Sequence, residues 1–145
     1  METTAAERQT KLIKEFADIS DWESRYKKII EKGRNLPSYL EELRDDAHKV
    51  RGCQSQVWLD AKFVDGKLIF EGDSDASIVK GLVAMLLEVF SGSTPAEIIA
   101  TQPEFLTSLG MDQNLSQTRV SGLASMMKQI KIYAIAYQAI SERKT

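Results

Sequence analysis

The feature that most constrains the fold of this chain is a β-hairpin signal near its middle. Apolar and polar residues alternate from Val57 to Phe63, a period-two pattern that is typical of a half-buried strand. Asp65-Gly66 follows, a dipeptide that favours tight hairpin turns, and Lys67 to Glu71 reads as the returning strand. Because two strands alone are only marginally stable in water, the hairpin needs a covering helix or a third strand. Residues 47–53 are the expected third strand.

Helical patterns lie on both sides of this hairpin. A Ser or Thr three residues before a Glu is the spacing of a capping box, and it precedes apolar residues that recur every three or four positions. Gly33 is expected just after the end of the second helix. Helices are predicted to begin near Thr4, Ser20, Ser38, Ser74 or Asp75, Thr94, Glu104 and Ser116. With no internal repeat or linker, residues 1–145 are expected to form one α+β domain, a small antiparallel sheet packed against several helices.

The counts of cysteine and histidine exclude whole classes of protein. One of each excludes an internal disulfide and a zinc site built from Cys and His. A formal net charge of −2 argues against nucleic acid as the main partner. Lys80, Glu88 and Lys131 interrupt the apolar stretches, so no membrane span is expected. The polar stretch Met1 to Lys11 predicts no secretory signal, which fits the reducing cytoplasm.

Cys53 is the first candidate for chemistry. It lies in a predicted loop near Lys49 and Arg51, and cationic neighbours favour the nucleophilic thiolate. The local chemistry equally allows a small buried side chain, which is the commoner role of a lone cysteine. His48 is close enough in sequence to be considered as a base, but five residues on a loop define no geometry, and a structural histidine is the preferred interpretation.

Other residues offer weaker signals for function. The acidic residues form no convincing catalytic pair, and nucleotide-binding or metalloprotease motifs are absent from the sequence. Met126 and Met127 are expected to fill the core. Arg119 lies in the first turn of the last predicted helix, where the helix dipole disfavours a cation, so it is a candidate for pairing with a carboxylate or for contacting a partner.

Three segments, in order along the chain, resemble the motifs of one protein family. They are Val50 to Leu59, which contains Gly-Cys-Gln-Ser-x-Val-Trp, then Asp73 to Leu82, and finally Leu115 to Leu123. This pattern resembles the SufE family of sulfur acceptor proteins, which includes CsdE-like cysteine desulfuration proteins. The resemblance covers nearly the whole chain and implies a SufE/IscU-like fold.

The resemblance also implies a function for Cys53. Members accept sulfur as a cysteine persulfide from a cysteine desulfurase that uses pyridoxal phosphate (PLP), of the SufS or CsdA type. They stimulate that enzyme and pass the sulfur to an iron–sulfur cluster assembly scaffold like the SufBCD complex. The transfer is thiol–disulfide exchange chemistry, which needs one accessible thiolate and no metal or resident cofactor. The chain is therefore expected to be an accessory protein rather than an enzyme, and to act in the cytoplasm.

Further residues take expected roles from the same resemblance. Arg119, Asp75, Arg51 and Gln54 are expected to contact partners. The family's cysteine loop is thought to hold the thiol in an apolar pocket that protects a persulfide from oxidants and small thiols. The expected lining residues here are Val50, Val57 and Trp58. Ser121 stands where many relatives carry Asn or Gln.

Two alternatives to a sulfur carrier remain open at the level of sequence. One is a regulator that binds a desulfurase or another enzyme through the helical face around Arg119 and carries no sulfur; it would keep its activity without Cys53. The other, a free-standing thiol enzyme, is disfavoured because no base or cofactor motif accompanies Cys53. The sequence leaves both a monomer and a homodimer open.

Overall fold

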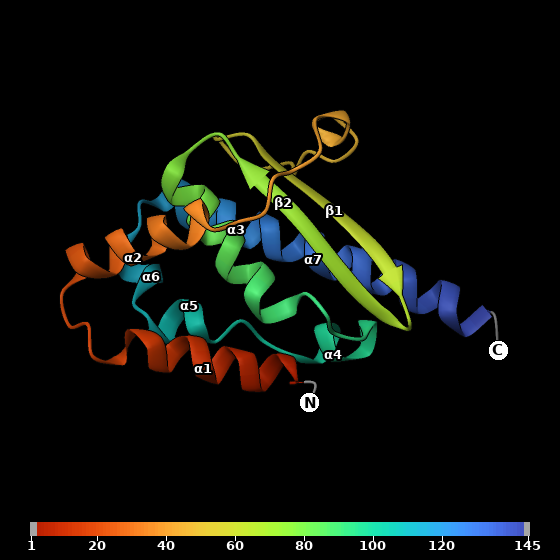
Figure 1. The fold of residues 1–145 in the computed structure, drawn as a ribbon, viewed down its shortest axis with the longest axis horizontal. Helices are drawn as coiled ribbons and strands as arrows, with labels where there is room; N and C mark the ends of the chain where they lie inside the picture. Colours follow the sequence, from red (N-terminus) through yellow and green to blue (C-terminus); the bar gives the residue numbers. More distant parts are fainter. Residues whose placement is uncertain (1–2, 144–145) are drawn as a thin grey trace.

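The predicted hairpin is present in the computed structural model, which describes residues 3–143, and it lies over helices α3 (Ser77–Phe90) and α7 (Gln117–Arg143) (Figure 1). The helices before it are α1 (Ala5–Ala17), α2 (Trp22–Arg34) and the short 3₁₀ helix η1 (Glu41–Leu43). The strands are β1 (Val57–Val64) and β2 (Lys67–Ser74). The helices after it are α3, α4 (Pro95–Ala100), α5 (Phe105–Ser108), α6 (Met111–Asn114) and α7. This order confirms the α+β prediction, although α6 was not foreseen.

The sheet has two strands in the part of the chain that the structure describes. They pair antiparallel, and the turn between them has positive φ angles at Asp65 and Gly66. The prediction of a third strand over residues 47–53 is wrong. Two backbone hydrogen bonds join residues 48–50 to β1, and Lys49 forms only an isolated bridge with Trp58. A turn at Arg51-Gly52 then ends the pairing, so the segment is too short to become a strand.

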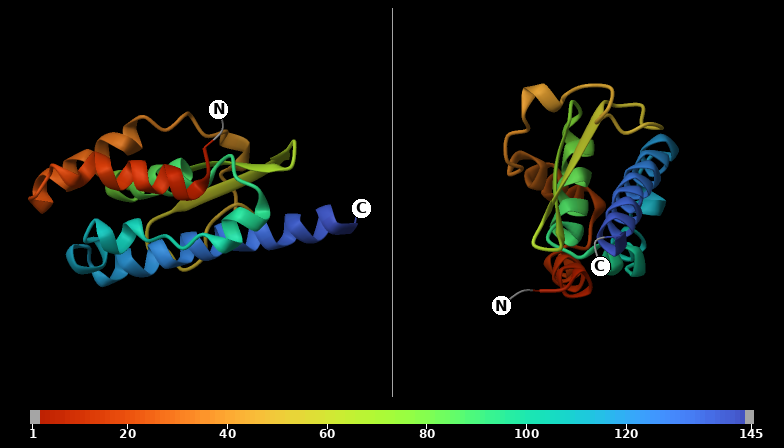
Figure 2. Two further views of the ribbon diagram at one scale, coloured as in Figure 1. Left: turned by 90° about the horizontal axis from the view of Figure 1, so that it is seen from below. Right: turned by 90° about the vertical axis from the view of Figure 1, so that its right-hand side faces the viewer.

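Helix α3 is the core of the molecule. Ten of its fourteen residues are buried, because the hairpin covers one side of it and α1 and α2 cover the others (Figure 2). Helices α2 and α3 cross at Gly33 and Gly81, where a Cβ on Gly81 would lie 2.1 Å from the carbonyl oxygen of Ile29. The sequence predicted Gly33 just after the end of α2, but it lies inside the last turn of that helix. Its function is to permit close helix packing.

The helix caps confirm part of the sequence prediction. Thr4 forms a complete capping box with Glu7. Thr94, which directly precedes Pro95, accepts a hydrogen bond from the backbone amide of Glu97. Two other caps differ. Asp21 caps α2 in place of Ser20, because its side chain accepts from the Ser24 amide. Helix α3 begins after Ala76 without a side-chain cap, since Ser74 and Asp75 form other hydrogen bonds.

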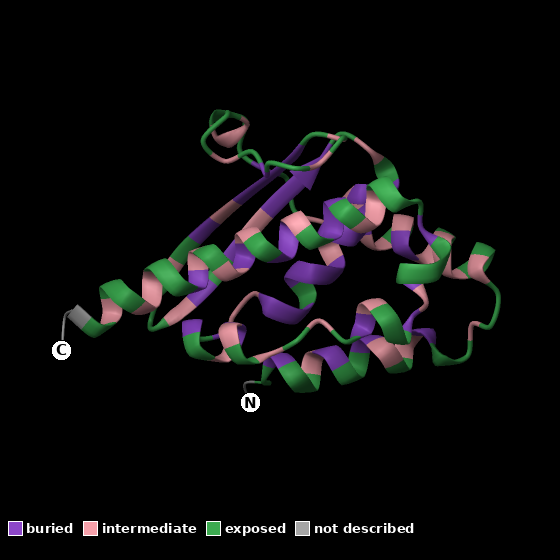
Figure 3. Cartoon of the chain, turned by 180° about the vertical axis from the view of Figure 1, so that it is seen from behind, coloured by how far each residue is buried: buried purple, intermediate pink, exposed green. Residues whose placement is uncertain are grey.

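Helix α7 packs against the same face of the hairpin as α3 and continues beyond it. Its 27 residues correspond to about 40 Å of helix. Tyr133 packs edge-on against Phe70, and its hydroxyl donates a 3.2 Å hydrogen bond to the Leu59 carbonyl oxygen. The outer side of α7 is largely exposed (Figure 3). Among the described residues, no helix is both long enough and apolar enough to cross a bilayer.

The opposite face of the hairpin is covered near the start of β1. Arg44, in the connection after η1, lies 5.0 Å from the Trp58 ring centre and forms an ion pair with Asp73. Trp58 is consequently buried, with 8% of its surface exposed. This cover stabilises the end of the hairpin from which both the loop of Cys53 and helix α3 extend.

Candidate functional site

The site is built on the cysteine loop, residues 51–55, which enters β1. Both ends of this loop are tied to the fold. At its start, the Val50 amide donates to the Val57 carbonyl oxygen at 2.8 Å. At its end, Gln56 and Asp75 form two hydrogen bonds: the Asp75 amide donates to the Gln56 carbonyl oxygen at 3.2 Å, and the Gln56 amide donates to Asp75 Oδ1 at 3.0 Å. Asp75 therefore joins the end of the loop to the segment that enters α3.

Gly52 lets the loop lie directly on α7. Gly52 has a φ of +90°, and a Cβ there would lie 2.5 Å from Ser125 Oγ. Gly122, one turn earlier on α7, receives the thiol: Cys53 Sγ lies 3.5 Å from its carbonyl oxygen, with the sulfur as donor. A Cβ on Gly122 would still be 3.7 Å from the sulfur, an ordinary contact distance. The thiol is thus half-buried against the first turns of α7.

The environment of Cys53 stabilises the neutral thiol. Burial raises the pKa of Cys53 above its usual value, since a charged sulfur is poorly solvated there. The Gly122 carbonyl oxygen accepts a hydrogen bond and has no proton to offer a thiolate. The expectation that Lys49 and Arg51 would favour the thiolate is not met, because both side chains point to exposed surroundings. In this conformation Cys53 is therefore held in its less reactive form.

A cavity of about 370 Å³ opens beside the thiol. It brings together the three segments that resemble the family motifs: the cysteine loop, the first half of α3 and the start of α7. The lining residues are Cys53, Gln54, Ser55, Val79, Leu82, Ser116, Thr118, Arg119, Gly122 and Met126. The expected lining by Val50, Val57 and Trp58 is wrong, since Val50 and Val57 lie in the core and Trp58 packs under Arg44. The apolar wall comes instead from α3 and Met126.

Arg119 and Gln54, two of the residues predicted to contact partners, both line this cavity. Arg119 is half-buried, and its guanidinium donates a 3.4 Å hydrogen bond to the hydroxyl of Tyr26 on α2. The side chain is therefore held at the cavity by a neutral group and keeps its charge available. Gln54 is exposed on the loop itself. Their contacts with a partner stay a prediction.

Asp75 and Arg51 lie outside this cavity. Asp75 accepts the hydrogen bond that holds Gln56, so its first role in the fold is to anchor the loop. Arg51 is exposed on the opposite side of the loop, in a second hollow with Lys49 and Lys128. Cys53, Gln54 and Arg119 thus share one cavity. Arg51 lies in the second hollow, and Asp75 lines neither of the two.

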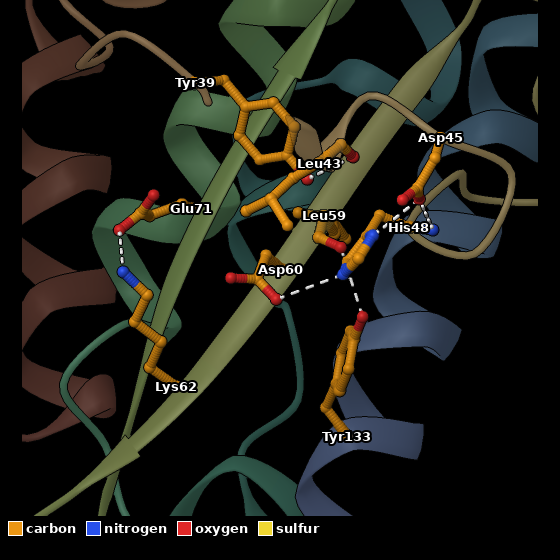
Figure 4. A network of polar contacts seen from close by, with 9 residues as sticks. All are labelled: Tyr39, Leu43, Asp45, His48, Leu59, Asp60, Lys62, Glu71 and Tyr133. Atoms are coloured by element: carbon orange, nitrogen blue, oxygen red, sulfur yellow. Dashed lines mark hydrogen bonds and ion pairs between the residues drawn. The ribbon is translucent and has the colours of Figure 1, made fainter. Parts of the chain in front are cut away.

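His48 belongs to a separate polar network (Figure 4). Its Nδ1 atom lies 2.7 Å from Asp45 Oδ1, and its Nε2 atom lies 3.6 Å from Asp60 Oδ1. The backbone carbonyl oxygen of His48 also accepts a 2.9 Å hydrogen bond from the Leu59 amide. These contacts agree with a structural histidine that fixes the segment before the cysteine loop, and they direct its ring to Asp45 and Asp60 rather than to the thiol.

Sequence reasoning did not identify Gly122 and Ser125 as parts of the site. Their spacing of three places them on one face of a helix, but nothing local indicates that the cysteine loop covers that face. The contact between Arg119 and Tyr26 was not predicted either. Within residues 3–143, no cluster of three or more His, Cys, Asp or Glu side chains is arranged to hold a metal ion.

The chain is similar to known proteins over most of its length. Residues 10–134 match a family model described as "SufE: Fe-S metabolism associated domain". The chain is 38% identical over 128 residues to an uncharacterized SufE-like protein of Synechocystis sp., covering 88% of this chain and 80% of that protein. It is 44% identical over 127 residues to another from Rhizobium meliloti, covering 83% and 89%. A protein of Thermus thermophilus, described as hypothetical and solved in solution, superposes with a TM-score of 0.75 at 18% identity, over 91% of this chain and 96% of that one. That last likeness supports the fold alone.

Proposed function

Because this chain belongs to the SufE family, whose function is related to sulfur transfer and iron–sulfur metabolism, we propose that Cys53 is its sulfur acceptor. In this proposal the donor is the persulfide of a PLP-dependent cysteine desulfurase, which the protein also stimulates. The recipient is an iron–sulfur cluster assembly scaffold. The protein is then an accessory carrier, acting in the cytoplasm where thiols remain reduced. The observation that carries the proposal is the position of the one cysteine at a cavity lined by all three family-like segments.

The proposed transfer is a thiol exchange at sulfur. The Cys53 thiolate attacks the terminal sulfur of the desulfurase persulfide, the S–S bond of that persulfide breaks, and the desulfurase cysteine leaves as a thiolate. A new S–S bond then joins Cys53 to the transferred sulfur. No net oxidation occurs, and no metal or resident cofactor is needed. The second transfer repeats the exchange with Cys53 as the leaving group.

The cavity supports the proposal because it has room for the product. A volume of about 370 Å³ greatly exceeds that of one added sulfur atom. Val79, Leu82 and Met126 supply apolar walls, which would limit access of water and oxidants to a persulfide. The cavity also contains the Arg119 guanidinium, which suits the negative charge of a deprotonated persulfide. Each transfer then requires the loop to leave α7, because the Gly122 contact and burial favour an unreactive thiol.

Mass spectrometry after incubation with a desulfurase tests the proposal directly. The wild-type protein, given the cysteine desulfurase of the same organism and L-cysteine, should gain one sulfur atom on Cys53, and a reductant should remove it. Cys53→Ser should gain none and should fail to stimulate the desulfurase fully. If Cys53→Ser stimulates the desulfurase as well as the wild type does, the protein is a binding regulator and the carrier proposal is wrong.

A further inference from the structure

A second hollow lies on the other side of the cysteine loop, between the loop and α7. It has a volume of about 610 Å³. We call it the basic groove, and its lining residues are Asp46, Ala47, Lys49, Arg51, Gly52, Ser125, Lys128, Gln129 and Ile132. Gly52 faces this groove while the next residue, Cys53, faces the cavity described above. The two hollows therefore share the loop as a common wall.

The charge of the basic groove is opposite to that of the chain as a whole. Lys49, Arg51 and Lys128 are all exposed, and no acidic side chain in the described part of the chain forms an ion pair with any of them. Asp46 is the acidic residue among those that line the groove. The full sequence carries a formal charge of −2, so the groove is a local positive region in a slightly acidic molecule. Such a region attracts anionic partners and orients them.

We propose that the basic groove binds an acidic segment of the protein that exchanges sulfur with Cys53. The identity of that partner rests on the proposed function, but the chemistry of the groove does not. The groove combines three cations with the hydrogen-bonding side chains of Ser125 and Gln129 and the apolar side chain of Ile132, which is 46% exposed. That mixture suits a peptide carrying carboxylates, because a nucleic acid backbone requires a longer array of cations on a basic protein.

The position of the groove explains how a partner can be held without blocking the chemistry. An acidic segment there contacts Arg51 and Gly52 from the side opposite to the thiol. The cavity lined by Arg119 stays free for the transferred sulfur. Binding there also places the segment against Gly52 and Ser125, where the loop lies on α7. Docking and release of Cys53 are thereby linked through one short loop.

Charge reversal on the two sides of the groove tests the proposal. Lys49→Glu with Lys128→Glu changes the loop side and the helix side together. The matched control is Lys11→Glu with Lys14→Glu, which makes the same change in net charge at exposed positions on α1. The groove variant should bind the desulfurase about tenfold more weakly at low salt, with the difference shrinking as salt rises, and the control should bind like the wild type.

A probe that does not depend on sulfur transfer separates this proposal from the proposed function. Hexaglutamate added to the wild-type protein should shift the NMR signals of the Gly52, Ser125 and Gln129 amides, and these shifts should be lost in the groove variant only. That result supports the groove even if Cys53 takes up no sulfur. Equal weakening in both charge-reversed variants, absent shifts at the groove, or tighter binding of an oligothymidylate than of hexaglutamate would overturn the proposal.

Discussion

Replacing Gly52 with alanine perturbs the contact that holds the cysteine loop on α7. The residue has a φ of +90°, a conformation that an L side chain adopts only with strain. Its added Cβ would also lie 2.5 Å from Ser125 Oγ and 3.3 Å from Ser125 Cβ. Both penalties apply to the closed loop and disappear when the loop leaves α7. The substitution should therefore favour the open loop while leaving the core intact.

The size of the effect follows from these two penalties. A non-glycine residue at positive φ costs about 1–2 kcal/mol. Displacing the Ser125 hydroxyl from its present rotamer costs about 0.5–1.5 kcal/mol. The closed loop should then lose about 2–3 kcal/mol relative to the open loop, a shift of about thirtyfold or more in their ratio. Because the open thiol is no longer buried, its alkylation at neutral pH should accelerate at least about tenfold.

The assay is the rate of Cys53 alkylation by iodoacetamide, with a thermal melt to show that the fold is retained. Gly66→Ala is the matched control: Gly66 also has a positive φ, but its Cβ would meet no atom within 4 Å, and it lies at the hairpin tip. It should lower stability without changing the alkylation rate. Gly52→Ala combined with Ser125→Ala should recover part of the effect. An unchanged alkylation rate in a folded Gly52→Ala protein would refute the reasoning.

Three further predictions follow from the packing and the charges. Gly81→Ala should lower the free energy of unfolding in denaturant melts by at least about 2 kcal/mol. The cost of overpacking against α2 exceeds the gain of about 1 kcal/mol in helix propensity. A neutral effect would contradict the close crossing of the two helices. Burial raises the pKa of Cys53, so alkylation of the native protein should reach half its maximal rate at a higher pH than in the urea-unfolded chain; coincident pH profiles would disprove this. Burial opposes the ionisation of Asp73, yet hydrogen bonds led by the one from Arg44 lower its pKa. Its stabilising effect is present above about pH 4 and is lost as the pH falls through the native pKa. Asp73→Asn should thus be less stable than the wild type at pH 7, and the difference should shrink as the pH falls below about 4. A constant difference in the unfolding free energy would exclude this role.

The parts of the fold that the sequence predicted correctly are those with local causes. The hairpin turn depends on two adjacent residues, Asp65 and Gly66, and the cap at Thr94 depends on a backbone amide three residues away. The failures have causes elsewhere in the chain. Gly33 looks like a helix stop, but it faces Gly81 on another helix and is kept small by that contact. Residues 47–53 have the length of a strand, but the turn at Gly52 serves the cysteine loop instead.

The candidate site likewise combines features with local causes and features that depend on distant parts of the chain. Cys53 was identified because its neighbours in sequence form a specific motif. The groups that bury it come from α3 and α7, and the Gly122 carbonyl oxygen lies 69 residues later in the chain. Lys49 and Arg51 are near the thiol in sequence, yet both face the basic groove rather than the sulfur. Proximity along the chain made a thiolate favoured by Lys49 and Arg51 one of two open alternatives, whereas burial raises the pKa of Cys53.

The raised pKa of Cys53 affects the proposed transfer of sulfur in two opposite ways. A thiol with a raised pKa is a poor nucleophile, so the resting protein is protected from oxidants and from small disulfides. The same burial slows the exchange that a carrier must perform twice. In the proposed transfer, the free energy that opens the loop comes from binding a partner. It must exceed what burial of the thiol and its hydrogen bond to Gly122 contribute to the closed state. A partner that binds beside the loop, on the side away from the sulfur, can supply this energy before any reacting atoms meet. Reactivity of Cys53 would in that case be conditional on docking, which is the property that separates a specific sulfur carrier from a free thiol.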